Sequence, residues 1–251
     1  MIQRPDFWDT VARNVYVHRA DIEKLDSHTV IFKDGPSISV DVIVCATGFR
    51  NDYPFFTETQ HYELGLPHQP LNNESETRWA HLEAEADKKV IYQFPKLANP
   101  PALATPLPAM QRTPNRLYNC IVPFEDDSIA FVGNVYVPNG FRVAEVQALW
   151  VTAFFDGMLD LPSVEDMRQD VAWVNAFQKR RYPAHGSKGN YFQYDMMGYI
   201  DRLLGQIGLE RHRKGWWGDM VYPFVAADLA GAGMEYLDKY REKSGGQRKS
   251  G

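Results

Sequence analysis

Cysteine is scarce in this chain, which has only Cys45 and Cys120 among its 251 residues. Cys45 lies inside an apolar run, so we expect a buried small side chain rather than half of a disulfide. So little cysteine favours a reducing compartment, and we expect a cytoplasmic protein. The sequence has no H-E-x-x-H or C-x-x-C spacing, so we predict no metal site.

Long apolar runs and an excess of positive charge are also missing. No run approaches the roughly 18 apolar residues of a membrane-spanning helix, and no charged-then-apolar signal layout opens the chain. The formal net charge is −5, which gives no electrostatic reason to expect a nucleic-acid partner. The composition, 44% hydrophobic and 24% charged, is that of an ordinary globular protein.

Glycine-rich phosphate-binding motifs are absent as well. The sequence contains no G-x-G-x-x-G, no P-loop and no G-x-S-x-G. The chain therefore has no motif that would cradle a dinucleotide pyrophosphate, and no nucleophile elbow of a hydrolase.

The first fifty residues are predicted to be β structure. We expect strands at 15–17 and 29–32, then a turn at Asp34-Gly35 and a returning strand at 37–40. The segment 41–50, DVIVCATGFR, has a short β-branched run that Gly48 ends. This pattern predicts a buried parallel strand at 41–47 that enters a tight turn, as strands do beside the cofactor crevice of open α/β sheets.

Residues 51–116 are rich in proline and polar residues, so we expect an irregular excursion with one short, solvated helix at 74–88. We interpret His61, His68 and His81 in this region as surface residues. Further on, 129–132 is predicted to be a second buried strand, and helices are predicted at 143–158, 166–181, 194–207 and 234–243.

The strand, loop and helix of 129–150 form the second informative segment. Such a unit directs backbone N–H groups and the positive end of a helix dipole beyond the end of the strand. That environment suits a phosphate or the electron-rich edge of a flavin ring. An ordinary β-loop-α unit with no ligand explains the same pattern.

These two segments together resemble flavin-containing monooxygenases and the related Baeyer–Villiger enzymes. The segment 41–50 is similar to the closing strand of the nicotinamide-binding domain in that family. The segment 116–140 resembles the return into the flavin domain, and 144–163 resembles the helix that follows. The resemblance implies an α/β fold, a partial Rossmann-like flavoprotein with two dinucleotide-binding domains and a helical C-terminal region.

The resemblance divides the chain into four parts. Residues 1–50 would end the nicotinamide-binding domain, 51–116 would be the excursion, 117–242 would complete the flavin domain with helices, and 243–251 would be a disordered tail. It implies FAD and NADPH as cofactors, and oxygenation of a small organic metabolite. It names no catalytic residue, and it implies the following cofactor-binding residues: Thr47, Gly48, Gly133, Asn134, Asn139, Gly140, Arg142 and Glu145.

In the family, the glycine motifs precede the regions matched here. We therefore expect a truncated enzyme that works with a complementing N-terminal half or as a homodimer. Two alternatives remain open. The chain could be a cofactor-free remnant that acts as a small-molecule binding protein, cyclase or isomerase, or it could have no activity.

Overall fold

The computed structural model describes residues 5–46, 53–103 and 110–247. The chain divides into two compact units, 1–52 and 53–251, and each is described by itself.

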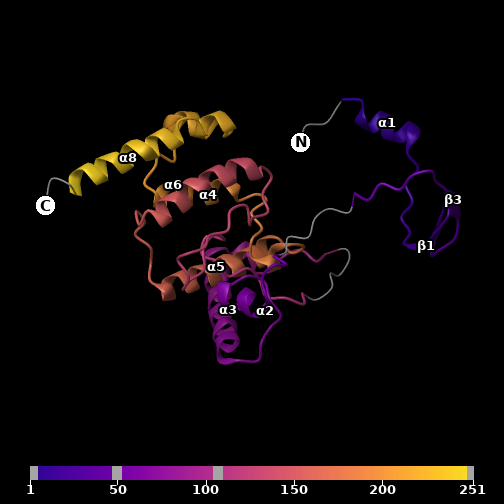
Figure 1. Cartoon of the computed structure of the whole chain (residues 1–251), viewed down its shortest axis with the longest axis horizontal. Helices are drawn as coiled ribbons and strands as arrows, with labels where there is room; N and C mark the ends of the chain where they lie inside the picture. The colour runs from indigo at the N-terminus through magenta and orange to yellow at the C-terminus, as the bar shows by residue number, and fades with distance from the viewer. Residues whose placement is uncertain (1–4, 47–52, 104–109, 248–251) are drawn as a thin grey trace. The chain divides into compact units, whose positions relative to one another are not determined.

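The first unit contains a helix, α1 (Phe7–Asn14), and a small antiparallel sheet of order β1-β2-β3 (Figure 1). The strands are β1 (Ile22–Asp26), β2 (Thr29–Phe32) and β3 (Ser37–Ser39). The expected strands at 29–32 and 37–40 are confirmed, and Val30 and Phe32 turn their side chains into the small core. The expected strand at 15–17 is wrong, because these residues are irregular and exposed.

The predicted buried strand at 41–47 is also wrong. Val42 and Val44 are 76% and 83% exposed, and 42–46 has no regular structure. Cys45 is exposed rather than buried. A parallel strand needs neighbours in its sheet and cover on both faces, and within the described part of this unit only antiparallel strands occur. The turn residues Thr47 and Gly48 lie outside the described residues.

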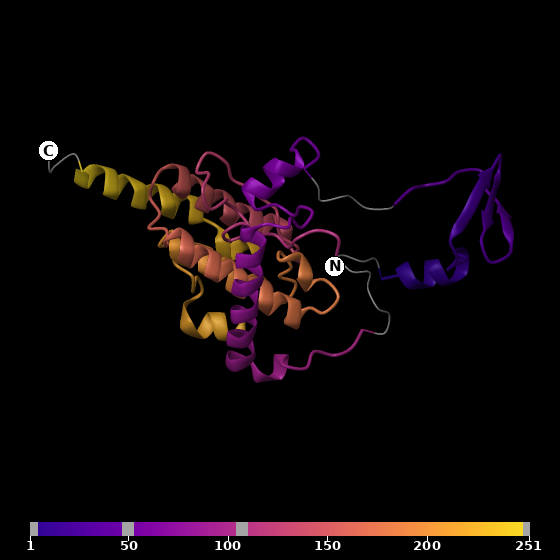
Figure 2. The same ribbon diagram turned by 90° about the horizontal axis from the view of Figure 1, so that it is seen from below.

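The second unit is helical, and Figures 1 and 2 show its helices from two directions. They are α2 (Glu58–Leu64), α3 (Glu74–Gln93), α4 (Gly140–Phe155), α5 (Val164–Arg181), α6 (Met196–Gln206), α7 (Gly215–Val221) and α8 (Ala232–Gln247), with 3₁₀ turns at Pro95–Leu97, Gly186–Lys188 and Ala226–Leu229. The expected helices at 143–158, 166–181, 194–207 and 234–243 are confirmed. The described parts of the expected irregular region 51–116, residues 53–103 and 110–116, contain two α-helices rather than one, and α8 runs to Gln247 through part of the expected disordered tail.

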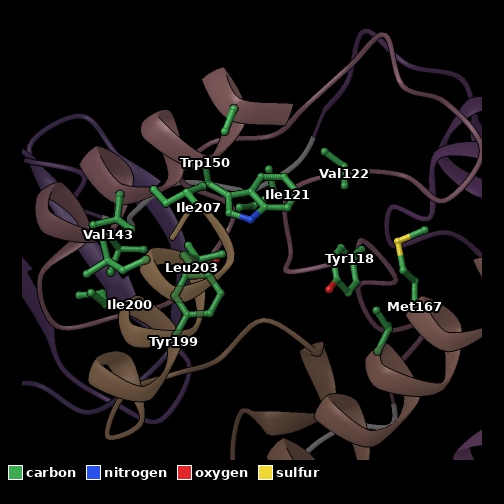
Figure 3. Packing of buried hydrophobic residues seen from close by; sticks show 14 of the residues in the cluster. Tyr118, Ile121, Val122, Val143, Trp150, Met167, Tyr199, Ile200, Leu203 and Ile207 are labelled. Carbon is green, nitrogen blue, oxygen red and sulfur yellow. The ribbon is translucent and has the colours of Figure 1, made fainter. Parts of the chain in front are cut away.

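The core of this unit lies between two pairs of helices. α3 packs on α5, and α4 packs on α6. Figure 3 shows Val143 and Trp150 of α4 against Ile200 and Leu203 of α6, and all four side chains are fully buried. α4 buries one face, which carries Val143, Val146, Trp150 and Ala153, whereas Phe141 and Phe155 on the same helix are exposed.

The expected strand at 129–132 is wrong, although a backbone hydrogen bond and a buried ring hold this segment in place. Phe131 donates its backbone N–H to the carbonyl of Ile121 at 2.8 Å, and its ring is buried with Leu66 and Leu117 in a second, smaller cluster. Val132 is 48% exposed. The hydrogen bond from Phe131 is a single contact rather than part of a ladder, so no strand results.

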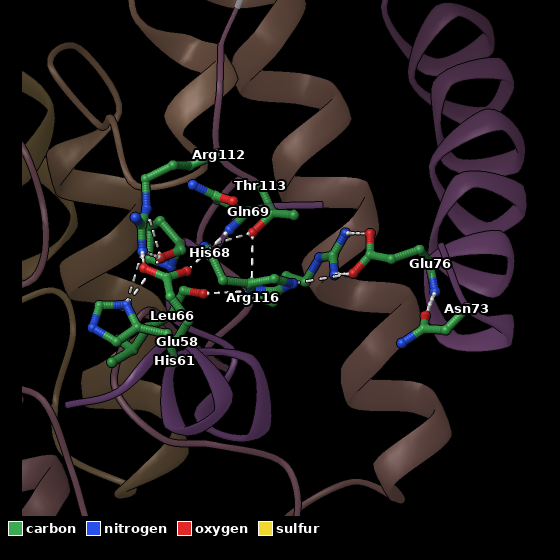
Figure 4. Close-up of polar contacts among 11 residues, drawn as sticks. Glu58, His61, Leu66, His68, Gln69, Asn73, Glu76, Arg112, Thr113 and Arg116 are labelled. Atoms are coloured by element: carbon green, nitrogen blue, oxygen red, sulfur yellow. Dashed lines mark hydrogen bonds and ion pairs between the residues drawn. The ribbon is translucent and has the colours of Figure 1, made fainter. Parts of the chain in front are cut away.

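A buried ion pair fixes the first turn of α3 to the segment before Tyr118 (Figure 4). Arg116 donates from its two terminal nitrogens to the two carboxylate oxygens of Glu76, at 2.6 and 2.8 Å. Its guanidinium also lies 4.7 Å from the centre of the Trp79 ring. Such a two-point pair is among the stronger polar contacts in proteins.

Two of the three histidines expected at the surface belong to this region instead. His61 and His68 are 4% and 1% exposed, whereas His81 is exposed as expected. The Nδ1 and Nε2 atoms of His68 lie 2.9 Å from the Leu66 carbonyl and 3.2 Å from a Glu76 oxygen. Because both ring nitrogens of His68 have oxygen partners, the imidazole can be buried without leaving a polar atom unpaired.

We expect Glu76→Gln to lower the free energy of unfolding by about 3–5 kcal/mol at pH 7, because Arg116 would stay buried without its counter-charge. Hydrogen bonds from Arg116 hold the pKa of Glu76 below its usual value. The pair therefore stabilises the fold above the ordinary carboxyl range near about 4.3, and its contribution is lost as pH falls through the lower pKa of the folded state.

Urea unfolding at pH 7 and at pH 3 measures both effects. The control is Glu85→Gln, which removes an exposed carboxylate paired with Lys88 and should leave stability nearly unchanged, because water and salt screen exposed pairs. Equal losses in the two variants at pH 7 would contradict the role of the buried pair.

Candidate functional site

The candidate site is the segment that leads into α4, together with the first turns of that helix. Asn139 caps the helix, because its Oδ1 accepts the backbone N–H of Arg142 at 3.4 Å. An Asn at this position satisfies one of the amides that a helix N-terminus leaves unpaired. The predicted loop-to-helix transition is therefore confirmed.

Gly133 occupies a turn that depends on glycine. Its φ is +82°, and a Cβ built on it would meet no atom within 4 Å, so the space beside this residue is open. Its N–H, however, points inward and donates to Gln147 Oε1 at 2.8 Å. The expectation that the backbone amides of this turn face outward toward a ligand is wrong for Gly133.

Gln147 is the first member of a buried chain of hydrogen bonds. Its side chain is fully buried and donates from Nε2 to the Tyr199 hydroxyl at 2.6 Å. Tyr199 in turn donates to the Asn119 carbonyl at 2.7 Å. Burial raises the pKa of Tyr199 well above its usual value, so the phenol stays protonated and serves as both acceptor and donor. Figure 3 shows Tyr199 beside Leu203 and Ile200 in the core.

The series of hydrogen bonds from Gln147 through Tyr199 reaches Asn119, where two consecutive residues have unusual backbone geometry. Asn119 and Cys120 have φ values of 53° and 57°, in the left-handed region that costs a residue with a Cβ roughly 1–2 kcal/mol. Side chains hold them there: Asn119 Nδ2 donates to Gln206 Oε1 at 2.8 Å, and Trp150 donates to the same oxygen at 2.8 Å.

The other predicted site residues lie around the same turn and helix. Asn134 is buried, and its carbonyl accepts from Asn190 at 3.3 Å. Arg142 donates from Nη1 to the Phe224 carbonyl at 3.0 Å. Gly140 and Glu145 are exposed on α4.

Two donors in this region have no partner among the described residues: Asn134 Nδ2 and Arg142 Nε are both buried and unpaired. Unpaired buried donors are uncommon in folded proteins and call for an acceptor. Gly133, the residue before Asn134, has open space where a side chain would lie. No cluster of three or more His, Cys, Asp or Glu that could hold a metal occurs in the described ranges.

Gln147 and Tyr199 were not predicted as site residues. A signal for Gln147 was present, since it lies on the apolar face of α4, four residues after Val143 and three before Trp150. A polar side chain on such a face requires a buried partner. Nothing in the sequence pairs it with Tyr199, which lies on another helix.

Comparison with curated proteins finds monooxygenases. FAD-dependent monooxygenase DEP4 of Fusarium langsethiae is 36% identical over 220 residues, which cover 84% of this chain and 37% of that protein. FAD-dependent monooxygenase rstn6 of Aspergillus nomiae is 31% identical over 85% of this chain and 38% of its own length. The chain is related to flavin-dependent monooxygenases.

Flavin-containing monooxygenase FMO GS-OX3 of Arabidopsis thaliana is 27% identical over 80% of this chain and 34% of that protein, so the resemblance seen in the sequence is confirmed. The chain spans less than two fifths of the length of these relatives. No protein-family profile matches it. Among solved structures, S-allyl-L-cysteine S-oxygenase from Allium sativum aligns with a TM-score of 0.44 and 19% identity, over 87% of this chain and 43% of the other. None of the helices in the described ranges is long and apolar enough to cross a membrane.

We expect Tyr199→Phe to lower the free energy of unfolding by about 1–3 kcal/mol, because it leaves Gln147 Nε2 and the Asn119 carbonyl buried without a partner. Urea denaturation followed by far-ultraviolet circular dichroism measures the loss. Tyr92→Phe is the matched control, since Tyr92 is 87% exposed and should tolerate the change. A Tyr199→Phe protein as stable as the control would show that the hydrogen-bond chain contributes nothing.

Proposed function

We propose that this chain forms the C-terminal part of a flavin-dependent monooxygenase that uses FAD, NADPH and molecular oxygen to oxygenate a small organic metabolite. The flavin, when bound, supplies the oxygen chemistry. The protein supplies binding, orientation and exclusion of water. In this proposal the segment from Gly133 to Glu145 contacts the flavin.

The observation that carries the proposal is the Gly133–Asn134 turn in front of α4. The turn has an unpaired buried amide donor and open space beside a left-handed glycine. It lies in the part of the chain that aligns with proteins named FAD-dependent monooxygenases. A left-handed glycine allows a planar ligand to approach the backbone closely.

Each residue has a defined part in the proposal. Asn134 and Arg142 would help to hold the flavin, since each has a side-chain donor without a partner among the described residues, and the N-terminus of α4 would contribute the positive end of the helix dipole. Gln147 and Tyr199 do not touch the flavin. They hold the Gly133 turn in position, because Gln147 Oε1 accepts the Gly133 N–H.

These residues contain no motif that would hold the pyrophosphates of the two cofactors. The sequence has no G-x-G-x-x-G, which supplies the backbone cradle for a dinucleotide. We propose that a complementing N-terminal polypeptide, or a second copy of the chain, supplies the missing contacts. Thr47 and Gly48 stay part of this proposal as cofactor-binding residues.

We expect FAD to be retained when the chain is produced together with the N-terminal part of DEP4 from Fusarium langsethiae, the part that precedes the aligned region. The measurement is the visible flavin spectrum after desalting. Gly133→Ala should weaken retention by roughly tenfold, since the added methyl enters the space assigned to the flavin.

Gly157→Ala is the control. Gly157 also has a positive φ, +65°, and nothing within 4 Å of a built Cβ, so both variants bear the same backbone strain of roughly 1 kcal/mol. Equal flavin loss in both variants would contradict flavin contact at Gly133. A colourless complex with every N-terminal partner tried would contradict the flavin proposal as a whole.

A further inference from the structure

We infer that the chain pairs with a second copy of itself through the exposed apolar surface of 216–225, which is called the tryptophan patch below. The patch consists of six exposed side chains on α7 and the segment after it: Trp216, Trp217, Met220, Val221, Tyr222 and Val225. The pairing itself does not depend on flavin binding.

The short helix α7 turns its apolar side to water. Trp216 and Met220 are four residues apart, as are Trp217 and Val221, so the four side chains form one stripe on the helix. All four are exposed. A surface helix of a globular protein normally points such a stripe at the core. The parts of the chain that the structure describes leave this stripe uncovered, so α7 presents it to a partner.

Ion pairs hold the opposite side of α7 against the protein. Lys214 Nζ lies 3.7 Å from Asp219 Oδ1 and 3.2 Å from Asp228 Oδ2. The Asp219 side chain is mostly buried as a result, on the side of the helix away from the stripe. Because these contacts fix which side of α7 faces inward, the helix cannot turn its stripe to the core without breaking them.

The exposed area is large enough for a stable interface. Trp216, Trp217 and Tyr222 are 68%, 68% and 67% exposed. A buried aromatic side chain removes roughly 150–250 Å² from water, so covering these three removes roughly 300–500 Å² per copy. The other three side chains of the patch add to this and bring it toward the roughly 800 Å² per partner of a standard interface. Apolar patches of this size mark interaction surfaces.

The charges around the patch favour a protein partner over an anionic membrane. Residues 210–228 include three acidic and three basic residues, whose charges cancel. Two of the basic residues are already paired, since Arg213 Nη1 lies 2.9 Å from Glu235 Oε2 and Lys214 contacts Asp228. Binding to anionic lipid draws on a cluster of several free Lys and Arg residues, which this surface does not offer.

A second copy suits the patch because a two-fold interface joins the same surface on both partners. Such a surface must not repel itself. Asp219 is the only charged residue in 215–225, and it is turned inward, so two patches can meet without like charges between them. Trp and Tyr are also the residues that carry most of the binding energy in protein interfaces.

The patch adjoins the candidate flavin site. The Phe224 carbonyl, two residues after Tyr222, accepts from Arg142 Nη1 at 3.0 Å. The Phe224 ring lies 6.0 Å from the Arg142 guanidinium and 5.6 Å from Lys214 Nζ. A second copy on the patch therefore comes next to the start of α4, where the proposed function requires contacts from another polypeptide. This functional consequence rests on the proposed function, whereas the pairing does not.

Sedimentation velocity of the whole chain over a range of concentrations tests the pairing. The chain should sediment as a dimer with a Kd of about 1 μM or tighter. Trp217→Glu should weaken dimerisation by at least roughly a hundredfold, because it brings two like charges together at a surface that the dimer removes from water.

Two control variants should stay dimeric. Trp8→Glu makes the same change at a tryptophan that is 69% exposed on α1, so it controls for the loss of an exposed indole. Val44→Lys charges the exposed run at 42–44 and controls for association through that run.

A second measurement reads the patch in the unsubstituted chain. Backbone amides of 215–222 should exchange with deuterium more slowly at high protein concentration than at low concentration. This dependence should vanish in Trp217→Glu. Far-ultraviolet circular dichroism of that variant, compared with the parent chain, checks that its helices remain folded.

Four results would overturn the inference. They are a monomer at every concentration, a dimer that Trp217→Glu leaves intact, a dimer that Trp8→Glu or Val44→Lys disrupts, and exchange at 215–222 that does not depend on concentration. Trp217-dependent binding of a monomeric chain to vesicles of phosphatidylcholine and phosphatidylserine, or to the N-terminal part of DEP4, would also overturn it. None of these measurements uses flavin, so the dimer and the proposed flavin site can fail separately.

Discussion

A fully buried side-chain amide needs hydrogen-bond partners for both its oxygen and its nitrogen. In this protein Gln147 is such an amide. Its oxygen accepts the Gly133 N–H and its nitrogen donates to Tyr199. One side chain thereby fixes the turn before α4, α4 itself and α6 in a single arrangement. Apolar packing between α4 and α6 is not directional, whereas the two hydrogen bonds of Gln147 require specific partner atoms on α6 and in the turn.

The Glu76–Arg116 pair also joins separate segments of this unit, but through opposite charges rather than through a neutral amide. It joins α3 to the segment that leads into Tyr118 through opposite charges in a two-point contact. Its contribution therefore depends on pH, whereas the neutral chain from Gln147 does not change until Tyr199 ionises far above the usual tyrosine range. The two networks meet in the segment 116–120, where Arg116 and Asn119 lie within one short stretch.

Helices were predictable from the sequence because their apolar spacing is local: α4, α5, α6 and α8 all occur where the spacing places them. The strands at 41–47 and 129–132 were not, because a β-branched run becomes a strand only when another strand pairs with it. Burial of His61 and His68 depends partly on residues far along the chain, because Thr113 Oγ1 lies 3.2 Å from Nδ1 of His68 and Arg112 Nη2 lies 3.3 Å from Nδ1 of His61. The relationship to flavin-dependent monooxygenases was readable because whole segments carry it, whereas the partner of Gln147 is set by tertiary structure alone.

The exposed run at 42–44 affects how the protein behaves in concentrated solution. Val42, Ile43 and Val44 present apolar side chains to water, and the run has no charged residue to discourage pairing with a copy of itself. Short, uncharged, β-branched stretches with free backbone groups are templates for intermolecular strand addition. Colloidal stability of the isolated chain is therefore governed by a few residues outside the helical unit, and thermal stability of the helices does not protect against it.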